Sequence, residues 1–400
     1  MSAIGVGQTA NLESLLHARP GVGPARFVEG WSREFPVGEV PLSNAELSAL
    51  CGAPVDWPRT TLLSIVALQE ALTQAGLADG SGMRLIGGTT VGGMDLTERI
   101  FPQYSPNHGC GASTDLAALY VSGFEDATTL STACSSAANA FIFGANLIRT
   151  GQCERVVVGG SESLSLYHLN GFHSLMILDR QPCRPFDATR AGLNLGEGAA
   201  YLVLETAESA SKRGVKPLAR LAGFGNACDA FHQTASSENG EGAFLAMCKA
   251  LAMAELKPSD IDYVNAHGTG TPNNDASEST ALKRLFNEAV PPVSSTKAFT
   301  GHTTSASGSI EAVFCLLALQ HGFLPPQLNW HTPDVSCITP YCISPACRSE
   351  LDARQSVRPE AEGDNRGQSP LKGVNGITNV ICNAFGFGGN DSSLIFSAYE

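Results

Sequence analysis

The chain has 400 residues, of which 43% are hydrophobic, and it contains 42 glycines and 22 prolines. This composition predicts a globular protein with a large buried core joined by many tight turns. The formal net charge of −13 favours solubility. It argues against nucleic acid or an anionic membrane as a partner of the whole surface.

A membrane-spanning segment is not expected. The longest apolar candidate, residues 312–319, is short and is flanked by Glu311 and Gln320. The first residues, MSAIGVGQTA, lack a basic segment followed by an apolar one, which argues against a secretory signal. We therefore expect a cytoplasmic protein.

The twelve cysteines show no CxxC pair and no regular spacing, and several lie within apolar segments. Reduced thiols are the simplest interpretation. Cys337, Cys342 and Cys347 recur every five residues, a spacing that fits neither a zinc knuckle nor one face of a helix. We therefore interpret this spacing as coincidence.

Hydrophobic periodicity predicts alternating helices and strands in the first half of the chain. In chain order, these are helices over 11–18 and 60–75, strands over 84–90 and 128–131, a helix after Cys134, strands over 155–158 and 198–205, and a helix over 208–214. The glycines at 159 and 160 are expected to end a strand in a turn that contains Ser161-Glu162-Ser163. Segments 101–114 and 179–194 are expected to be irregular.

The second half repeats the alternation. The predicted elements are a strand over 218–224, a helix over 242–254, a strand over 262–265, a helix over 277–288, a strand over 293–295, a helix over 307–321 and a hairpin of 379–383 with 392–396. Residues 354–370 are polar and aperiodic, which indicates a solvated loop. The pattern predicts an α/β architecture of layered sheets covered by helices, with halves at 1–215 and 216–400.

Cys134 lies where a β-rich segment gives way to small residues and then to apolar residues of helical period. This places Cys134 in the first turn of a helix, where unpaired N–H groups and the helix dipole stabilise a thiolate. The alternative is that Cys134 is only a small buried hydrophobic residue, which a cysteine among alanines often is.

Two further segments place a histidine in a polar turn after a buried strand. His267 follows the strand that ends at Asn265, and His302 follows a second short strand and Lys297. Strand ends in layered α/β proteins converge on one crevice, so both histidines are expected to face the pocket of Cys134. Each histidine alone could equally be a turn residue hydrogen-bonded to the backbone.

The glycine-rich element at 383–390, NAFGFGGN, joins two predicted strands. A dinucleotide-binding loop requires a helix N-terminus for the pyrophosphate, so that interpretation fails here. Glycines allow backbone N–H groups to approach a ligand closely, which suits an oxyanion hole. The chain also contains no G-x-x-x-x-G-K-[ST] phosphate loop.

Together these motifs resemble those of the β-ketoacyl-acyl-carrier-protein synthases. The matching segments are STACSS around Cys134, CRPFDATRAGLNLGEGAA at 183–200, NAHGTGTP at 265–272, STKAFTGH at 295–302 and NAFGFGGN at 383–390. The resemblance runs nearly end to end. It implies a thiolase-like five-layer α-β-α-β-α fold of two similar halves, and a condensing enzyme of type II fatty-acid or polyketide synthesis.

By this resemblance, Cys134 is the nucleophile that accepts an acyl chain from carrier-protein phosphopantetheine. His267 and His302 bind the carbonyl of the malonyl thioester and stabilise the enolate that forms when CO₂ leaves. The backbone N–H groups of Cys134 and Phe387 form the oxyanion hole, and Phe387 also gates the acyl pocket. Two imidazole N–H donors can neutralise developing negative charge without a metal.

The resemblance also assigns supporting roles. Lys297 matches a structural lysine that pairs with Asp275 or Glu311. Three residues are implied to contact substrate: Thr269 and Thr271, which touch the pantetheine arm, and Phe385. No metal or bound cofactor is implied, because the acyl carrier protein supplies the phosphopantetheine. The implied partners are that protein, acyl and malonyl thioesters, and a second subunit that is either a copy of this chain or a paralogous ketosynthase.

Several features depart from the family pattern. The chain opens at MSAIGVG, where family members usually have an additional strand, and the span from Gly93 to Cys134 is short. TTSASGS follows His302, and Asn390-Asp391 replaces Thr-Asn. These departures resemble the specialised ketosynthases of bacterial aryl-polyene-like pigment pathways.

Three alternatives fit these motifs less well. Non-catalytic chain-length subunits lack the nucleophilic cysteine, and thiolases use a second cysteine as base. A zinc site built from Cys134, His267 and His302 has a reasonable ligand set, but the glycines and threonines after His267 suit a thioester arm better. Arg59, Lys212 and Arg213 are candidates for a basic patch that docks the acidic carrier protein.

Overall fold

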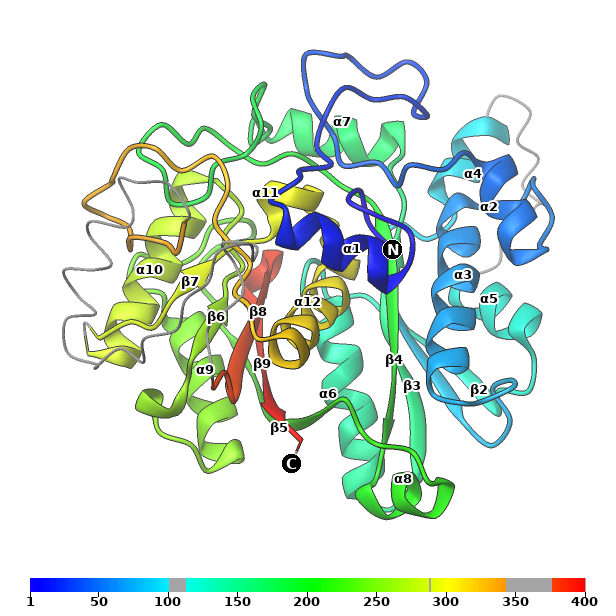
Figure 1. Ribbon diagram of the computed structural model, residues 1–400. Helices are drawn as coiled ribbons and strands as arrows, with labels where there is room; N and C mark the ends of the chain where they lie inside the picture. Colours follow the sequence, from blue (N-terminus) through cyan, green and yellow to red (C-terminus); the bar gives the residue numbers. More distant parts are fainter. Residues whose placement is uncertain (101–112, 288, 343–375, 400) are drawn as a thin grey trace, which may run out of the picture.

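The computed structural model describes residues 1–100, 113–287, 289–342 and 376–399 (Figure 1). Its first part contains α1 (Gly7–Leu16), α2 (Asn44–Cys51), α3 (Arg59–Gln74), β1 (Arg84–Gly88), α4 (Met94–Ile100), α5 (Ser113–Val121), β2 (Asp126–Leu130), α6 (Ser136–Arg149), β3 (Arg155–Glu162), α7 (Leu166–Ser174), β4 (Gly198–Glu205) and α8 (Ala207–Arg213). The second part contains β5 (Ala219–Cys228), α9 (Glu241–Ala254), η2 (Pro258–Asp260), β6 (Tyr263–Asn265), α10 (Pro272–Phe286), β7 (Val293–Ser294), α11 (Lys297–Thr300), η3 (Thr304–Ala306), α12 (Ser307–His321), β8 (Asn379–Gly386), η4 (Phe387–Gly389) and β9 (Asn390–Ala398).

The strands form two sheets whose orders are β2-β1-β3-β4 and β5-β9-β8-β6-β7. In the first sheet β1 is parallel to β2 and β3, whereas β4 is antiparallel to β3. In the second sheet β6 is parallel to β7 and β8, whereas β9 is antiparallel to β8. Thus β2-β1-β3-β4 corresponds strand for strand to β7-β6-β8-β9, and the two halves share one topology.

Only β5 has no counterpart among the described strands. It pairs antiparallel with β9, while the matching edge of β4 carries only a short bridge between Ser2 and Gly198. Within the described residues, that edge of β4 therefore carries no strand ladder.

The sheets and helices stack in five layers (Figure 1). Helices α3 and α5 cover the outer face of the first sheet, and α9 with α10 covers the second. Helices α6 and α12 fill the space between the sheets, where Phe141, Cys315, Val158 and Val380 belong to one core cluster. The predicted α/β five-layer fold of two similar halves is therefore confirmed.

The central helix α12 is apolar on nearly all sides because both of its faces are covered. Its buried residues include Phe314, Leu316 and Leu317. Small residues at its start let it approach α6 closely. A Cβ atom added to Gly308 would lie 2.8 Å from the backbone nitrogen of Ala138, so a larger residue has no room there.

Most predicted elements are present, with ends shifted by a few residues. The limits of β4 and α12 are as predicted, and β8 and β9 form the predicted hairpin. Two expectations are wrong. Cys134 precedes α6 instead of lying in its first turn, and Ser161 and Glu162 continue β3 instead of turning, because they pair with Ala199 and Gly198.

Short or weakly amphipathic helices were not predicted. These are α2, α4, α5, α7 and α11. The expected loop at 354–370 lies outside the described residues, as does most of the segment 101–114.

In the described part of the chain, no helix has the length and apolarity needed to cross a bilayer. Nine cysteines carry free thiols there, but Cys342 is disulfide-bonded, which differs from the expectation of reduced thiols throughout.

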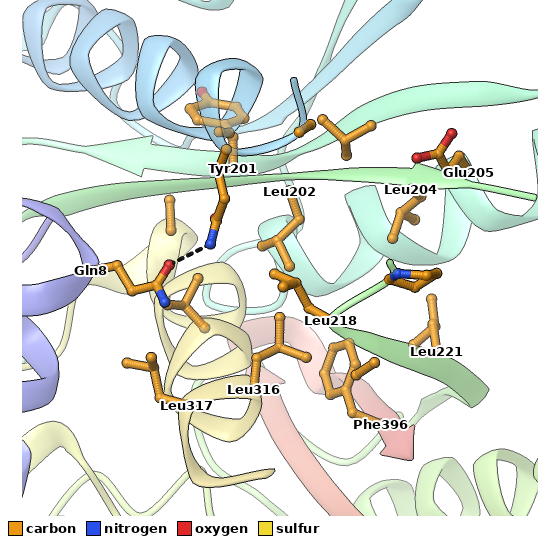
Figure 2. A pocket seen from close by; sticks show the side chains of 18 of the residues that line it. Gln8, Tyr201, Leu202, Leu204, Glu205, Leu218, Leu221, Leu316, Leu317 and Phe396 are labelled. Atoms are coloured by element: carbon orange, nitrogen blue, oxygen red, sulfur yellow. Dashed lines mark hydrogen bonds between the residues drawn. The ribbon is translucent and has the colours of Figure 1, made fainter. Parts of the chain in front are cut away.

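An apolar cavity of about 420 Å³ lies between the halves, beside β4 (Figure 2). Figure 2 shows Leu202 and Leu204 of β4 facing Leu218, Leu221 and Leu316 across it. Cys134, His267 and His302 are not among its lining residues, so this cavity is separate from the predicted site.

The three basic residues considered for carrier-protein docking already have acidic partners. Arg59 is buried: its Nη2 donates to Glu197 Oε1 at 2.6 Å and its Nε donates to Oε2 at 2.9 Å. Lys212 pairs with Glu208, and Arg213 pairs with Glu205. Arg59 therefore cannot belong to a docking surface, and the predicted patch is wrong for this residue.

Replacing Arg59 with Met is expected to lower the free energy of unfolding by about 3–5 kcal/mol, because it leaves the buried Glu197 carboxylate without its cation. Urea unfolding followed by circular dichroism measures this change. Lys212→Met, which removes an exposed pair, is the control and should leave stability nearly unchanged. Similar midpoints for the two variants would contradict the structural role of Arg59.

Candidate active site

Cys134 lies in a tight turn between β2 and α6. Ala133 adopts a left-handed backbone conformation, with φ of 53°. The turn is held by Ser136, whose Oγ donates to the Ala133 carbonyl at 2.6 Å and accepts from the Thr132 N–H at 2.9 Å. A non-glycine residue in this region is strained and persists because its surroundings hold it. The result is a thiol fixed just ahead of the helix and only 4% exposed.

His302 makes the contact on which the site is built. Its Nε2 lies 3.1 Å from Cys134 Sγ, and its Nδ1 lies 3.0 Å from Ser307 Oγ at the start of α12. Its backbone N–H donates to the Asn194 carbonyl at 2.7 Å, which anchors the residue to the loop before β4. The imidazole is therefore held at both ring nitrogens and at its backbone.

His267 reaches the same place from the end of β6. Its ring meets that of His302 edge to face, with centroids 5.3 Å apart. The turn is held by Glu278 of α10, which accepts from the N–H groups of His267 and Gly268 at 2.9 and 2.8 Å. The structure thus brings Cys134 and both histidines together, as the sequence predicted.

Lys297 is fully buried and pairs with Glu311 of α12, at 2.6 Å between Nζ and Oε1. Asp275, the other predicted partner, lies elsewhere. It accepts from the backbone N–H groups of Phe186 and Gly270, and it faces Arg190 at 3.7 Å. The suggested pairing of Lys297 with Asp275 is therefore wrong, and Asp275 instead holds the loop that precedes α10.

Phe385 lies near the end of β8, and Phe387 begins the turn that follows it. The backbone N–H of Phe387 is directed at the Cys134 sulfur. Its ring stacks on Phe172 of α7, with centroids 5.9 Å apart. Phe385 packs against the ring of His267 at 5.7 Å. These contacts place both phenylalanines beside the cysteine and the histidines.

Thr269 and Thr271 lie in the turn between His267 and α10. Their hydroxyl oxygens are 2.8 Å apart, and Thr269 is buried. The two threonines thus lie within four residues of His267, on the segment that the resemblance assigns to the pantetheine arm.

Burial dominates the electrostatics of Cys134. Removal from water raises the pKa of its thiol to about 11, although Lys297 and the Phe387 N–H act in the opposite direction. The thiolate expected from the helix dipole is therefore not the resting form, because desolvation is the larger effect. Burial and Lys297 also hold the pKa of His302 and that of His267 well below their ordinary value, so both imidazoles are neutral.

Glu311 balances Lys297 in this buried region. Burial raises the pKa of the Glu311 carboxyl to about 7, while the Lys297 ammonium draws it down. The ammonium contributes a positive field at Cys134 and at both histidines. This field lowers the pKa of each of the three groups, so it favours the thiolate and the neutral imidazoles.

Several contributors were missed because nothing local in the sequence marks them. Glu162, read as part of a turn, ends β3 and accepts from Thr89 Oγ1, the Val91 N–H and Ser305 Oγ, which ties the turn after His302 to the first sheet. Phe172 and His168 are on a helix that was not predicted. The ring centroids of His168 and Phe172 are 5.2 Å apart. The Nδ1 atom of His168 has no hydrogen-bond partner among the described residues.

A metal-binding arrangement was the chemical alternative. Within the described residues, no three His, Cys, Asp or Glu side chains are arranged to hold a metal ion. The donor set of Cys134, His302 and His267 is instead arranged around a direct thiol–imidazole contact.

The five layers and the buried cysteine–histidine cluster define a thiolase-like α/β protein. Comparison with known proteins narrows this class. Residues 58–210 match the model described as "Beta-ketoacyl synthase, N-terminal domain", and residues 218–331 match "Beta-ketoacyl synthase, C-terminal domain".

Relatives are similar over most of the chain. Nodulation protein E from Rhizobium meliloti is 34% identical over 380 residues, covering 88% of this chain and 87% of that protein. The 3-oxoacyl-[acyl-carrier-protein] synthase 2 from Staphylococcus aureus strain COL is 33% identical over 373 residues, covering 86% and 82%.

Among solved structures, the ishigamide ketosynthase/chain length factor matches with a TM-score of 0.83 and 28% identity, covering 100% of this chain and 97% of that one. A ketosynthase in complex with its chain length factor from Xenorhabdus doucetiae matches with a TM-score of 0.79 and 29% identity, covering 100% and 96%. The chain belongs to the β-ketoacyl synthase family. It is a β-ketoacyl-acyl-carrier-protein synthase, an acyltransferase that elongates a fatty-acid or polyketide chain by condensation.

The raised pKa of Cys134 predicts how its reactivity depends on pH. Between pH 7 and pH 9, alkylation by iodoacetamide should accelerate about tenfold per pH unit, because only the thiolate reacts and its fraction grows at that rate below the pKa. Mass spectrometry of the peptide containing Cys134 measures the rate, and Cys134→Ala gives the background from other thiols. A plateau at or below pH 8 would contradict a thiol that is protonated at rest.

Proposed function

We propose that Cys134 carries the growing acyl chain as a thioester, and that His267 and His302 act on a malonyl unit delivered by an acyl carrier protein. The observation that supports this most directly is the 3.1 Å contact between Cys134 Sγ and His302 Nε2, with the His267 ring at the edge of His302. This arrangement supports the proposal, because a thiol and two neutral imidazoles surround one point.

In the first step, the sulfur of Cys134 attacks the carbonyl carbon of an acyl thioester. The thiol proton passes to His302 Nε2, which can accept it because the imidazole is neutral. The tetrahedral oxyanion is stabilised by the backbone N–H groups of Cys134 and Phe387. Collapse of the oxyanion breaks the carbon–sulfur bond to pantetheine, and the departing thiolate takes up the proton.

In the second step, the malonyl thioester loses CO₂ and its carbonyl oxygen becomes an enolate oxygen. His267 and His302 each donate an N–H to that oxygen. Ser307 supports this change of role, because its hydroxyl can accept from or donate to His302 Nδ1 and so serves either tautomer. Thr303 Oγ1, 3.2 Å from Ser307 Oγ, extends this chain of hydroxyls.

In the third step, the enolate carbon attacks the acyl carbonyl on Cys134. The new carbon–carbon bond forms as the bond to sulfur breaks, and the released cysteine thiolate takes up one proton from solvent. The product remains on the carrier protein as a β-ketoacyl thioester. The chain itself needs no bound cofactor in this scheme, since the carrier protein supplies the phosphopantetheine arm.

Supporting residues follow from their positions. Thr269 and Thr271 would hydrogen-bond the pantetheine arm, and Phe385 would line the substrate site beside His267. Lys297 and Glu311 would set the electrostatic field without touching substrate. Phe387 would gate the acyl pocket, with its ring resting on Phe172.

The partners are also proposed. The acyl carrier protein is the donor of both thioesters, and the reaction takes place in the cytoplasm. A second subunit, either a copy of this chain or a paralogous ketosynthase, completes a dimer. Two similar solved structures support the paralogue, since each pairs a ketosynthase with a chain length factor.

Replacing Cys134 with Ala should reduce condensation by about a thousandfold or more, because no acyl thioester can form. The same variant should still release CO₂ from malonyl-carrier protein, since the histidines remain. Intact-protein mass spectrometry and ¹⁴CO₂ release measure the two activities. Cys153→Ala, which alters a half-buried thiol outside the site, is the control. Undiminished condensation by the Cys134 variant would exclude it as the nucleophile.

Replacing His267 or His302 with Ala should lower both CO₂ release and condensation by about 10²–10⁴-fold, because each removes an N–H donor to the enolate. The same assays apply, with His331→Ala as a matched histidine control. Normal turnover in either variant would count against the pair.

A further inference from the structure

Asn390, at the start of β9, joins three elements through a single atom. Its Oδ1 accepts from Ser135 Oγ at 2.9 Å, from Asn139 Nδ2 at 2.8 Å and from Asn226 Nδ2 at 2.9 Å. Ser135 directly precedes α6, Asn139 lies in the first turn of α6, and Asn226 lies on β5. The contact therefore spans both halves of the protein.

Further hydrogen bonds close this junction into a network. Ser392 Oγ donates to Asn139 Oδ1 at 2.9 Å, and Asn226 Nδ2 donates to Ser392 Oγ at 2.9 Å. Asn139 Nδ2 also donates to Thr132 Oγ1 at 2.8 Å. Such a network is rigid when every member has a partner, and it becomes costly when one acceptor is lost.

The network adjoins both backbone donors of the proposed oxyanion hole. Ser135 directly follows Cys134, and Asn390 lies three residues after Phe387. The two turns touch at Gly386, where an added Cβ would lie 2.8 Å from the Thr132 carbonyl oxygen and 3.1 Å from Ser135 Oγ. The Cys134 N–H belongs to the first half and the Phe387 N–H to the second, so their separation depends on this junction.

We propose that Asn390 is a positioning residue that sets the spacing between the Cys134 and Phe387 N–H groups. This proposal rests on the proposed function, because it concerns the oxyanion of the acylation step. The amide oxygen is suited to the task because it presents an acceptor to three donors, which an apolar side chain of the same size cannot do. An oxyanion hole depends on donor positions within a few tenths of an ångström, so a shift of one half against the other weakens it.

The test compares the rates of three reactions that depend on different parts of the site. Acylation of Cys134 by an acyl thioester passes through the oxyanion. Alkylation of Cys134 by iodoacetamide does not, and CO₂ release from a malonyl thioester uses the histidines. The variants are Asn390→Leu, which removes the acceptor, and Asn390→Asp, which keeps it. Asn379→Leu, at the far end of β8, is the matched control.

Asn390→Leu should lower the maximal acylation rate about 10–100-fold at nearly unchanged KM, since one donor of the hole is misplaced. CO₂ release should stay within about twofold, because it does not pass through this oxyanion. Alkylation should fall less than acylation, because it depends only on the contact between the Phe387 N–H and the sulfur. Asn390→Asp should acylate within about threefold of the unmodified protein, and the control should be unaffected.

An acylation rate of Asn390→Leu within twofold of normal would overturn the proposal, as would a parallel fall in all three rates, which would indicate general disruption. If Asn390→Leu does not fold, Ser135→Ala deletes one donor and should give a smaller, acylation-specific loss. If Cys134 of the unmodified protein is alkylated normally but is not acylated, the proposed function is wrong. The proposal for Asn390 is then wrong as well.

Discussion

The contact between a buried thiol and a buried imidazole, Cys134 Sγ to His302 Nε2 at 3.1 Å, organises the rest of the molecule. The two residues come from different halves, so the contact exists only when the sheets are stacked on α6 and α12. The tight turn at Ala133 holds the sulfur, and the Ser307 hydroxyl holds the imidazole at its other nitrogen. The fold in effect positions two atoms that are far apart in sequence.

Burial away from water determines the protonation states of Cys134, His267 and His302. Burial raises the pKa of Cys134 to about 11 and holds that of both histidines low, so the resting site contains a thiol and neutral imidazoles. A thiol that needs a base is then next to a base that is free to accept a proton. The Lys297–Glu311 pair places a cation nearby, and its own burial is compensated by a direct ion pair.

The internal repeat explains where the site lies. The corresponding strands β2 and β7 are followed by the segments that carry Cys134 and His302, and the turn after β8 carries Phe387. One backbone donor therefore comes from each half. Polar side chains at this junction, with Asn390 at its centre, join the two halves by hydrogen bonds.

Local sequence patterns were sufficient for the elements whose signals are local. The long apolar run of 307–321 and the short apolar run of 198–205 predicted α12 and β4 with the observed ends, because an apolar segment bounded by polar residues is recognisable from the local sequence alone. The turns that follow short buried strands likewise marked His267 and His302. Short helices such as α7 carry too few turns for a pattern, so Phe172 and His168 were not foreseen.

Only the tertiary structure decided which ionisable side chains form ion pairs and which are buried away from water. The sequence offered two acidic partners for Lys297, and the structure pairs it with one, Glu311. Arg59 was expected on the surface but is buried. The Cys134 thiol is less acidic than its place near a helix suggested. Desolvation and Coulomb energies depend on atoms contributed by distant segments, and no local pattern contains those distances. The sequence by itself therefore determined the candidates and their family, while packing determined their chemical state.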